Sequence, residues 1–348
     1  MFTKEKMMSA PFAPPLPHVV ILGSGASKAA MPNGDKSGKM IPLMDDLPKI
    51  LGNDWNALVK KTKPPKGNFE ANFSWIKKKG YFPSQLSNIE TLIKNYFSDL
   101  ELLNNSTMYD YLVLGLREKD VIATFNWDPF LMQAHKRNRN IASLPDIRFL
   151  HGCVSFRTCK EHDILGGPYE ACPECHCDLI GGRLFFPEED KDYTKDELIY
   201  RDWLAVEKKI QKAFHLTIFG YSGPATDYKA RKLLLNGWKQ TPVRDISHVE
   251  IIDTNDADIL RESWNEFFPH YHNIIESDFW NSSIALWPRR TAEWKLSASR
   301  YGIPSESIGP FRTESLIDLQ KWFLQLVQAE AEGTNTEGIQ PSGQLERA

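Results

Sequence analysis

The chain has 348 residues, of which 41% are hydrophobic and 25% are charged, so it can bury one large α/β core or two smaller ones. Its formal net charge of −3 argues against a dedicated nucleic-acid or membrane-surface binder, because such proteins usually carry a basic excess. No apolar run reaches the roughly 20 residues of a membrane span, and the first residues lack the apolar segment of a secretory signal. We therefore expect a cytoplasmic protein with no membrane partner and no direct nucleic-acid partner.

The chain begins with a predicted arm and continues as alternating strands and helices. Residues 1–17 are rich in proline, which favours an extended arm. Continuously apolar runs, typical of buried parallel strands, occupy residues 18–23, 120–126, 147–151, 216–220 and 248–253. Residues 196–214 carry an apolar stripe at helical spacing and predict a helix. This alternation predicts an α/β fold with a Rossmann-like doubly wound parallel sheet, whose ligand crevice lies beyond the carboxyl ends of the strands.

Two stretches interrupt the alternation of strands and helices. Residues 35–115 are mostly helical in pattern, and residues 152–195 contain the cysteines and few apolar side chains. We expect both to be insertions that form a smaller helical and zinc-ribbon module within one domain spanning residues 18–330. A last helix is predicted over residues 313–331, and the polar residues 331–348 are expected to form a disordered tail.

A glycine-rich turn follows the first predicted strand. Gly23 and Gly25 allow a tight turn and a close backbone approach, and the helix that starts there is expected to offer free N–H groups to a pyrophosphate. The third glycine of the dinucleotide fingerprint is missing, so a nucleotide loop and an ordinary turn both remain open for this motif alone. Asp45 and Asp46 lie at the distance of a ribose-binding acid. No strand precedes them, so we interpret them as surface or helix-start acids.

Polar residues also end the next two predicted strands. Thr124, Asn126 and Asp128 close one strand, and Asn or Asp in such a place is commonly a turn former. His151 and Gly152 close the other, and a lone histidine is more often structural than catalytic. Because parallel strands bring their carboxyl ends to one edge, we expect these side chains to face the same crevice.

The cysteines predict a metal site. All five lie in one short window, at Cys153, Cys159, Cys172, Cys175 and Cys177. A secreted disulfide scaffold would spread them further along the chain. The pairs Cys159-x2-His162 and Cys172-x2-Cys175 form two knuckles that can close a tetrahedral site around Zn²⁺. Four protein ligands leave no open position, so this zinc is expected to be structural.

The spacing between the two knuckles is shorter than usual. Cys153, His176 and Cys177 therefore remain competitors for one of the four ligand positions. Reduced free thiols in a polar loop are the alternative to a metal site.

Taken in order, these segments resemble the sirtuin (SIR2-like) family. Residues 23–27, Gly-Ser-Gly-Ala-Ser, are similar to the family's Gly-Ala-Gly-Ala-Ser loop. Thr124-x-Asn126-x-Asp128 is similar to its Thr-Gln-Asn-Ile-Asp motif, and His151 stands in a sequence similar to its catalytic His-Gly.

The later segments continue the resemblance to this family. Cys159 follows the His-Gly at a distance similar to the family's first zinc knuckle, and Cys172-Pro-Glu-Cys175 is similar to the second. Residues 220–222, Gly-Tyr-Ser, are similar to a Gly-Thr-Ser turn that holds the nucleotide, and Asn255 ends a segment in the place of an Ile-Asn. The resemblance covers roughly residues 18–260.

Several departures separate the chain from sirtuin deacylases. Those enzymes follow the glycine loop with Ala-Gly-Ile-Pro-Asp-Phe-Arg, whose Arg lies at the NAD site, whereas residues 30–39 contain no arginine. Residues 187–193 lack the Phe-Gly-Glu that borders the acyl-lysine cleft. Residues 220–227 and 87–90 are more similar to bacterial SIR2-like NAD⁺ hydrolases linked to phage defence.

The resemblance implies an NAD⁺ hydrolase that releases nicotinamide and ADP-ribose. It assigns Asn126 to orient a water or the ribose hydroxyls, and His151, whose ordinary pKa is near 6.5, to accept a proton. The residues implied to hold NAD⁺ are Gly23, Ser24, Gly25, Ala26, Ser27, Thr124, Asp128, Gly220, Ser222 and Asn255.

Two other functions remain open. An NAD-dependent protein-lysine deacylase would require an acyl peptide and yield O-acyl-ADP-ribose, and a non-catalytic regulatory subunit would bind NAD or ADP-ribose without turnover. Because a constitutive NAD⁺ hydrolase would deplete its own cell, we expect a gated effector of bacterial anti-phage defence. The expected partners are further copies of the chain and a separately encoded sensor or activator, such as a HerA-like ATPase, an Argonaute or a nucleotide-sensing subunit.

Overall fold

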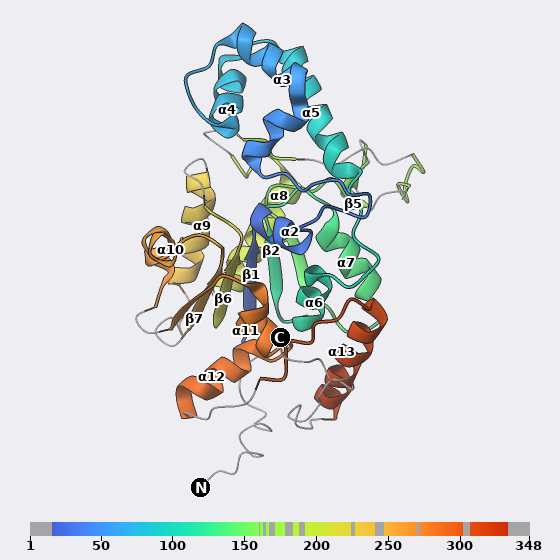
Figure 1. Ribbon diagram of the computed structural model, residues 1–348, viewed down its shortest axis with the longest axis vertical. Helices are drawn as coiled ribbons and strands as arrows, with labels where there is room; N and C mark the ends of the chain where they lie inside the picture. Colours follow the sequence, from blue (N-terminus) through green and yellow to red (C-terminus); the bar gives the residue numbers. More distant parts are fainter. Residues whose placement is uncertain are drawn as a thin grey trace.

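A computed structural model gives the fold of the protein. The residues that it describes are 16–159, 161–162, 165–166, 171–177, 184–187, 192–223, 227–240, 247–269, 272–301 and 307–332. Most of the expected N-terminal arm (residues 1–15) and nearly all of the expected tail (residues 333–348) lie outside them. A central sheet, helices on both of its faces and a helical module at one end make up the described chain (Figure 1).

The sheet has six parallel strands in the order β3-β2-β1-β6-β7-β8. The strands are β1 (His18–Leu22), β2 (Val121–Thr124), β3 (Asp146–Phe149), β6 (His215–Phe219), β7 (His248–Ile252) and β8 (Asn273–Glu276). From β1 the chain adds β2 and β3 on one side and then β6, β7 and β8 on the other, so the switch point of the strand order lies between β1 and β6. This order confirms the predicted Rossmann-like doubly wound sheet. Leu22 pairs with both Thr124 and Phe219, so β1, β2 and β6 end side by side.

The first five strands are the apolar runs of the sequence, but β8 (Asn273–Glu276) is an addition to the predicted set. Its residues are exposed or only partly buried, because it forms an edge of the sheet beside β7. An edge strand is covered less than a central one, so its sequence needs no continuous apolar run and gives a weak signal.

Successive residues of β1 enter two separate cores. Val20 and Leu22 belong to one core, whereas Val19 and Ile21 belong to the other. This is the alternation of a strand covered on both faces. The helices of the first core include α6 (Met108–Gly115), α7 (Phe130–Asn138) and α13 (Leu316–Ala331), and those of the second are α8 (Glu197–Ile210), α9 (Tyr228–Lys239) and α10 (Ala257–Trp264).

The predicted helices begin at side-chain caps. α8 starts after Asp196, whose carboxylate accepts the N–H groups of Leu198 and Ile199, and α13 starts after Ser315. Both caps satisfy backbone donors that the first turn of a helix leaves free. The remaining elements on this part of the chain are η4 (Asn265–Phe267), η5 (Phe279–Asn281), α11 (Ser283–Leu286) and α12 (Thr291–Tyr301). None of the helices in the described ranges is long and apolar enough to cross a bilayer.

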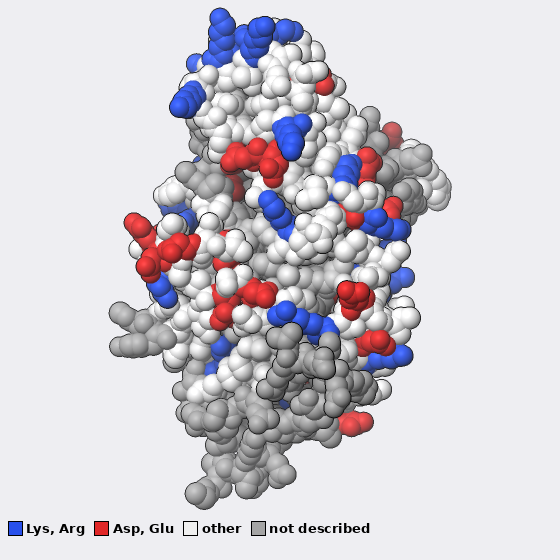
Figure 2. Space-filling view, viewed as in Figure 1, with Lys and Arg blue, Asp and Glu red and all other residues white. Residues whose placement is uncertain are grey.

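The two interruptions of the alternation have separate structures. α2 (Ser24–Ala30) follows β1 directly, and the helical interruption, residues 35–115, contains η1 (Met44–Asp46), α3 (Leu47–Thr62), α4 (Phe69–Lys79), α5 (Pro83–Ser98) and α6. α3 to α5 form the module at the top of Figure 1. The cysteine-rich one has the short antiparallel pair β4 (Arg157–Thr158) and β5 (Leu165–Gly166). The outer end of the helical module carries a group of Lys side chains (Figure 2).

Candidate functional site

A cavity of about 780 Å³ lies at the carboxyl ends of the strands, between the sheet and the helical module. A crevice at the reversal of strand order is the usual ligand site of such sheets. The predicted site residues that line it are Gly23, Ser24, Gly25, Ser27, Asn126, Asp128, His151, Gly220, Ser222 and Asn255. Ala26 and Thr124 are buried and are not among the lining residues.

Three glycines bring the loops after β1 and β6 into contact. The N–H of Gly25 donates to the carbonyl of Gly220 at 2.9 Å. A Cβ atom on Gly23 would lie 2.4 Å from the Gly220 oxygen, and one on Gly220, whose φ is +59°, would lie 2.2 Å from the nitrogen of Ala26. Any side chain at these places would separate the loops.

This contact corrects one expectation about the glycine loop. The N–H of Gly25 is bonded to Gly220, and the N–H of Ala26 donates to the carbonyl of Gly23 at 3.0 Å. These two N–H groups are therefore not free for a pyrophosphate. The glycines instead allow the loops after β1 and β6 to contact each other.

Asn126 is buried and has a fixed amide orientation. Its Nδ2 donates to the carbonyl of Gly23 at 2.8 Å, to Oγ of Ser27 at 2.9 Å and, at 3.3 Å, to the Tyr109 hydroxyl. A carbonyl can only accept, so the atom beside Gly23 must be the amide nitrogen. Thr124 supports the same residue, because its hydroxyl accepts the N–H of Asn126 at 3.0 Å. Among the described residues no hydrogen bond involves Oδ1 of Asn126, which leaves this acceptor for a ligand in the cavity.

Asp128 ends the hydrogen-bond chain that starts at Asn126. Its Oδ2 accepts the hydroxyl of Ser27 at 2.6 Å, and its Oδ1 accepts the N–H of Phe130 at 3.3 Å. Burial nevertheless raises the pKa of Asp128 to about 6. Tyr109 lies 2.7 Å from Oγ of Ser27, and burial, together with the charge of Asp128, raises its pKa, so it remains a phenol. The Ser27 hydroxyl thus links the carboxylate to the amide of Asn126.

His151 is buried directly after β3, among tyrosines and a carboxylate. Its Nε2 lies 3.2 Å from the Tyr193 hydroxyl and 3.8 Å from Oδ1 of Asp227. Phe125 packs against the imidazole edge to face, with ring centroids 4.7 Å apart, and Tyr221 stacks on Phe125. The Tyr221 hydroxyl donates to Asp227 at 3.2 Å. Burial and the charge of Asp227 raise the pKa of both tyrosines, which therefore stay protonated donors at neutral pH.

The sequence interpretation missed several residues around this site. Tyr193 and Asp227 end segments that differ from the deacylase pattern, which was the one signal that could have found them. Tyr109 lies on α6, in the helical stretch that precedes β2, and no motif surrounds it.

The cavity is acidic. Its carboxylates are Asp45, Asp46, Glu70, Asp128, Asp227 and Asp253, and among the described lining residues Lys28 has the one ammonium group. Acidic side chains gather below the helical module in Figure 2. Asp46 accepts the N–H of Leu43 at 2.9 Å in η1, as expected for a helix-start acid. Such a field favours a cationic centre over an anionic one.

The two predicted knuckles converge on one point. Sγ of Cys159 lies 3.5 Å from both Nδ1 of His162 and Sγ of Cys175, and Sγ of Cys172 lies 3.6 Å from the same Nδ1. All four ligand atoms lie within 4.8 Å of one another. Tetrahedral zinc with Zn–S near 2.3 Å and Zn–N near 2.0 Å requires ligand separations of about 3.5–3.8 Å. The Cys₃His group therefore fits Zn²⁺.

The competing ligands have other surroundings. Cys153 is buried beside the carbonyl of Asp128, at 3.5 Å, and burial raises its pKa to about 12. Cys177 is exposed and lies 3.7 Å from the carbonyl of Cys175, whereas the exposed His176 adopts a φ of +56° in the turn after the knuckle. None of the three belongs to the Cys₃His group.

The cysteine-rich module is attached at His151. The N–H of Phe185 donates to the His151 carbonyl at 2.9 Å, and Gly152 forms a bridge with Leu184. The N–H of Val154 donates to the carbonyl of Trp127 at 3.0 Å. The fold of this module therefore fixes, through these hydrogen bonds, the backbone of residues that line the cavity.

Comparison with known proteins adds a likeness of fold. No protein-family model and no curated protein matches the chain. A Sir2 homologue in complex with NAD matches with a TM-score of 0.35 and 12% identity, over 85% of this chain and 91% of that one. A Sir2 homologue mutant with ADP-ribose matches with 0.39 and 14%, over 87% and 100%. A mutant with 2′-O-acetyl ADP ribose matches with 0.42 and 12%, over 87% and 100%. The chain thus has a low-identity structural similarity to Sir2 structures, and its activity is argued below from its own residues.

Proposed function

We propose that the protein hydrolyses NAD⁺ at the bond between nicotinamide and ribose. The observation that carries the proposal is one acidic cavity lined by both an amide oxygen, from Asn126, and a buried imidazole, from His151. The sequence resemblance assigned the catalytic roles to the same two residues.

The acidic lining suits the charge that develops in this reaction. Nicotinamide leaves as a neutral molecule, because the electrons of the C1′–N1 bond return to the pyridinium nitrogen. The ribose carbon then becomes cationic, as in an oxocarbenium ion. Buried carboxylates such as Glu70 and Asp227 stabilise positive charge strongly where water is excluded. This is a reason for the site to keep more acids than bases.

A water molecule completes the reaction in this proposal. Its oxygen bonds to C1′ and its proton passes to His151, so that the products are nicotinamide, ADP-ribose and a proton. Oδ1 of Asn126 accepts a hydrogen bond from this water or from a ribose hydroxyl. Asp227, 3.8 Å from Nε2, stabilises the imidazolium that the transfer forms, and the Tyr193 hydroxyl orients the ring.

The remaining predicted residues have two kinds of role in NAD⁺ binding. Ser24, Ser222 and Asn255 are exposed in the cavity lining and can bond to phosphate or ribose oxygens. The glycines, Ala26, Ser27, Thr124 and Asp128 act by holding the loops and Asn126 in place. Lys28 supplies a positive charge for the pyrophosphate.

We propose that Zn²⁺ binds to Cys159, His162, Cys172 and Cys175 in a structural role. All four positions of a tetrahedral ion are then filled by protein, so the ion crosslinks the module and leaves no place for a reacting water.

The experiment that tests the activity is chromatography of NAD⁺ incubated with the purified chain, alone and together with the products of its neighbouring genes. Asn126→Ala and His151→Ala should each lower nicotinamide release by at least about a hundredfold, the usual contribution of a positioned acid–base group. Asn56→Ala, on the exposed side of α3, and His135→Ala, on α7, are matched controls and should retain wild-type rates. Wild-type cleavage by both site variants would contradict the residue assignment.

The same incubation separates water from acyl-lysine as the acceptor. Nicotinamide release without any peptide, with ADP-ribose as the second product, supports hydrolysis. A requirement for an acetylated peptide, with O-acetyl-ADP-ribose as product, would contradict it. Tight ADP-ribose binding without turnover would instead favour a regulatory subunit.

We further propose that the hydrolysis is gated and serves bacterial anti-phage defence, because unrestrained cleavage would empty the cell of NAD⁺. A separately encoded sensor or activator would then release the activity. NAD⁺ measured in cells carrying the chain and its genomic neighbours should fall on phage infection and stay level without it. Robust turnover by the isolated monomer would contradict gating.

A further inference from the structure

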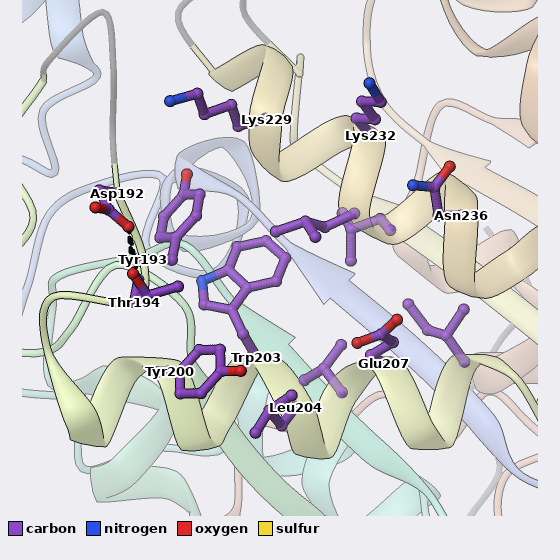
Figure 3. A pocket seen from close by; sticks show the side chains of 14 residues that line it. Asp192, Tyr193, Thr194, Tyr200, Trp203, Leu204, Glu207, Lys229, Lys232 and Asn236 are labelled. Atoms are coloured by element: carbon purple, nitrogen blue, oxygen red, sulfur yellow. Dashed lines mark hydrogen bonds between the residues drawn. The ribbon is translucent and has the colours of Figure 1, made fainter.

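A second cavity, of about 340 Å³, lies between α8 and α9 (Figure 3). Trp203 and Tyr193 lie in it, and each is 5% exposed. Large exposed apolar side chains gather on these two helices: Tyr200 (40%), Leu204 (36%), Tyr228 (63%) and Leu233 (38%). A soluble chain rarely exposes such a group unless another surface covers it.

The two walls of this cavity carry opposite charges. Glu207 projects from α8, and Lys229 and Lys232 project from α9 (Figure 3). Within the described part of the chain, neither Glu207 nor Lys232 takes part in an ion pair. A surface that carries an acid on one helix and a base on the other is complementary to itself after a twofold rotation, which would bring α8 of one copy against α9 of the next.

We propose that the α8–α9 surface is the contact through which two copies of this chain form a twofold dimer. Tyr228 is the first residue of α9, directly before Lys229 of the cavity lining, and it is 63% exposed. In the dimer each Tyr228 fills the cavity of the other copy, and Glu207 of each copy pairs with Lys232 of the other. This contact buries the exposed apolar side chains of α8 and α9 and at the same time pairs Glu207 with Lys232.

The same surface is linked to His151 through two side chains. The Tyr193 hydroxyl lies 3.2 Å from Nε2 of His151, and its ring packs on Trp203 with centroids 4.7 Å apart. The indole N–H of Trp203 donates to the carbonyl of Leu150 at 3.2 Å, one residue before His151. Covering the cavity therefore holds the imidazole in place from its side chain and from its backbone. This link rests on the proposed function, whereas the dimer does not.

Sedimentation velocity of the full chain tests the dimer. The wild type should sediment as a dimer in the micromolar range, and Leu204→Glu and Leu233→Glu should each sediment as folded monomers with wild-type circular dichroism. Ile259→Glu, an equally drastic change at a 60% exposed residue on α10, is the control and should stay dimeric. A monomeric wild type, or dimers of both leucine variants, would overturn the proposal.

Charge reversal provides a second test that does not depend on apolar substitutions. Glu207→Lys and Lys232→Glu should each weaken the dimer by about tenfold, since each places like charges together. The double variant restores opposite charges and should return the dissociation constant to near the wild-type value. Additive weakening in the double variant would overturn the twofold arrangement.

The link to His151 is tested by nicotinamide release from the same proteins. Monomeric Leu204→Glu should cleave NAD⁺ about tenfold more slowly than the dimer, and equal rates would overturn the link. Absence of cleavage from every form, also in the presence of the products of the neighbouring genes, would count against the proposed function and leave the sedimentation result as it stands.

Discussion

Individual residues around Asn126 show how a buried polar site is held open for a ligand. The amide nitrogen has three acceptors within the protein, whereas the amide oxygen has no bond among the described residues. Asp128 completes the same network but carries a cost, because burial raises its pKa. A charge kept in an unfavourable place is typical of functional sites.

The raised pKa of Asp128 leads to a prediction about stability. A carboxyl with a folded-state pKa of about 6 and an unfolded one near 3.9 is destabilising when ionised, so the cost is present above pH 6 and disappears as the pH falls towards 4. The free energy of unfolding of the wild type, relative to Asp128→Asn, should rise by about 2 kcal/mol between pH 7 and pH 4. Denaturant unfolding of both proteins across this range measures it. A difference that does not vary with pH would contradict the prediction.

The glycine contact gives a second prediction at this scale. Gly220→Ala should destabilise the protein more than Gly38→Ala, by about 2 kcal/mol or more, because only the first adds a clash to the strain of a positive φ. Gly38 has a φ of +80° and no atom within 4 Å of an added Cβ, which makes it a matched control. The measurement is chemical denaturation, and equal losses would show that the loops can separate without cost.

At the scale of elements, two features lie outside the cavity: the cysteine-rich module and the amino ends of the central strands. The module connects its Cys₃His group to the backbone of His151. At the amino ends of the strands, His18, His215 and His248 lie in neighbouring strands as a row of buried imidazoles. His18 and His215 have ring centroids 4.3 Å apart.

We expect the metal to maintain the cysteine-rich module. Cys172→Ser should lose bound zinc and lower Tm by roughly 5 °C or more, since binding energy at a structural zinc site is folding energy. Nicotinamide release should fall with it, because the module holds His151. Zinc analysis and calorimetry are the measurements, and Cys177→Ser, at an exposed thiol outside the group, is the control. Full zinc content in Cys172→Ser would contradict the assignment.

The row of histidines predicts sensitivity to acid. Burial lowers the pKa of His18, His215 and His248, so the folded protein keeps them neutral while the unfolded chain takes up protons below about pH 6.5. Through these three groups, stability should fall by about 4 kcal/mol for each pH unit below 6.5. His215→Leu should reduce the slope by about a third in urea unfolding. The exposed His176→Gln should leave it unchanged, and an equal effect of both would contradict the prediction.

In the whole molecule, the doubly wound sheet and the helical module lie on two sides of one cavity. Residues on both sides, such as Gly220 and Glu70, line it. A ligand in this place touches both bodies, so binding and the docking of the module should be coupled.

This coupling can be measured with ADP-ribose. At a hundred times its dissociation constant it should raise the free energy of unfolding by about 2.7 kcal/mol. Amide exchange should slow in α4 as well as in the loop after β6. Protection confined to the sheet loops would show that the module does not close on the ligand.

Local chemistry in the sequence was sufficient to predict the alternating fold, the two knuckles and the polar strand ends. Continuously apolar runs indicate strands that are buried on both faces of a sheet. A Cys-x2-Cys spacing places two thiolates where they can bind one tetrahedral metal ion. These signals depend only on neighbours along the chain. The exposed strand β8 escaped prediction because an edge needs little apolar sequence.

Only the tertiary structure decided which residues face one another across distant segments. The side chains that contact Asn126 and His151 include Tyr109, Tyr193 and Asp227. They come together because α6, the cysteine-rich module and the loop after β6 meet at the carboxyl ends of the strands. The use of two glycine-loop N–H groups by the protein itself and the exclusion of Cys153 from the metal group were decided in the same way. The physical reason is that hydrogen bonds, burial and ligand geometry depend on distances in space, which residue spacing along the chain does not specify.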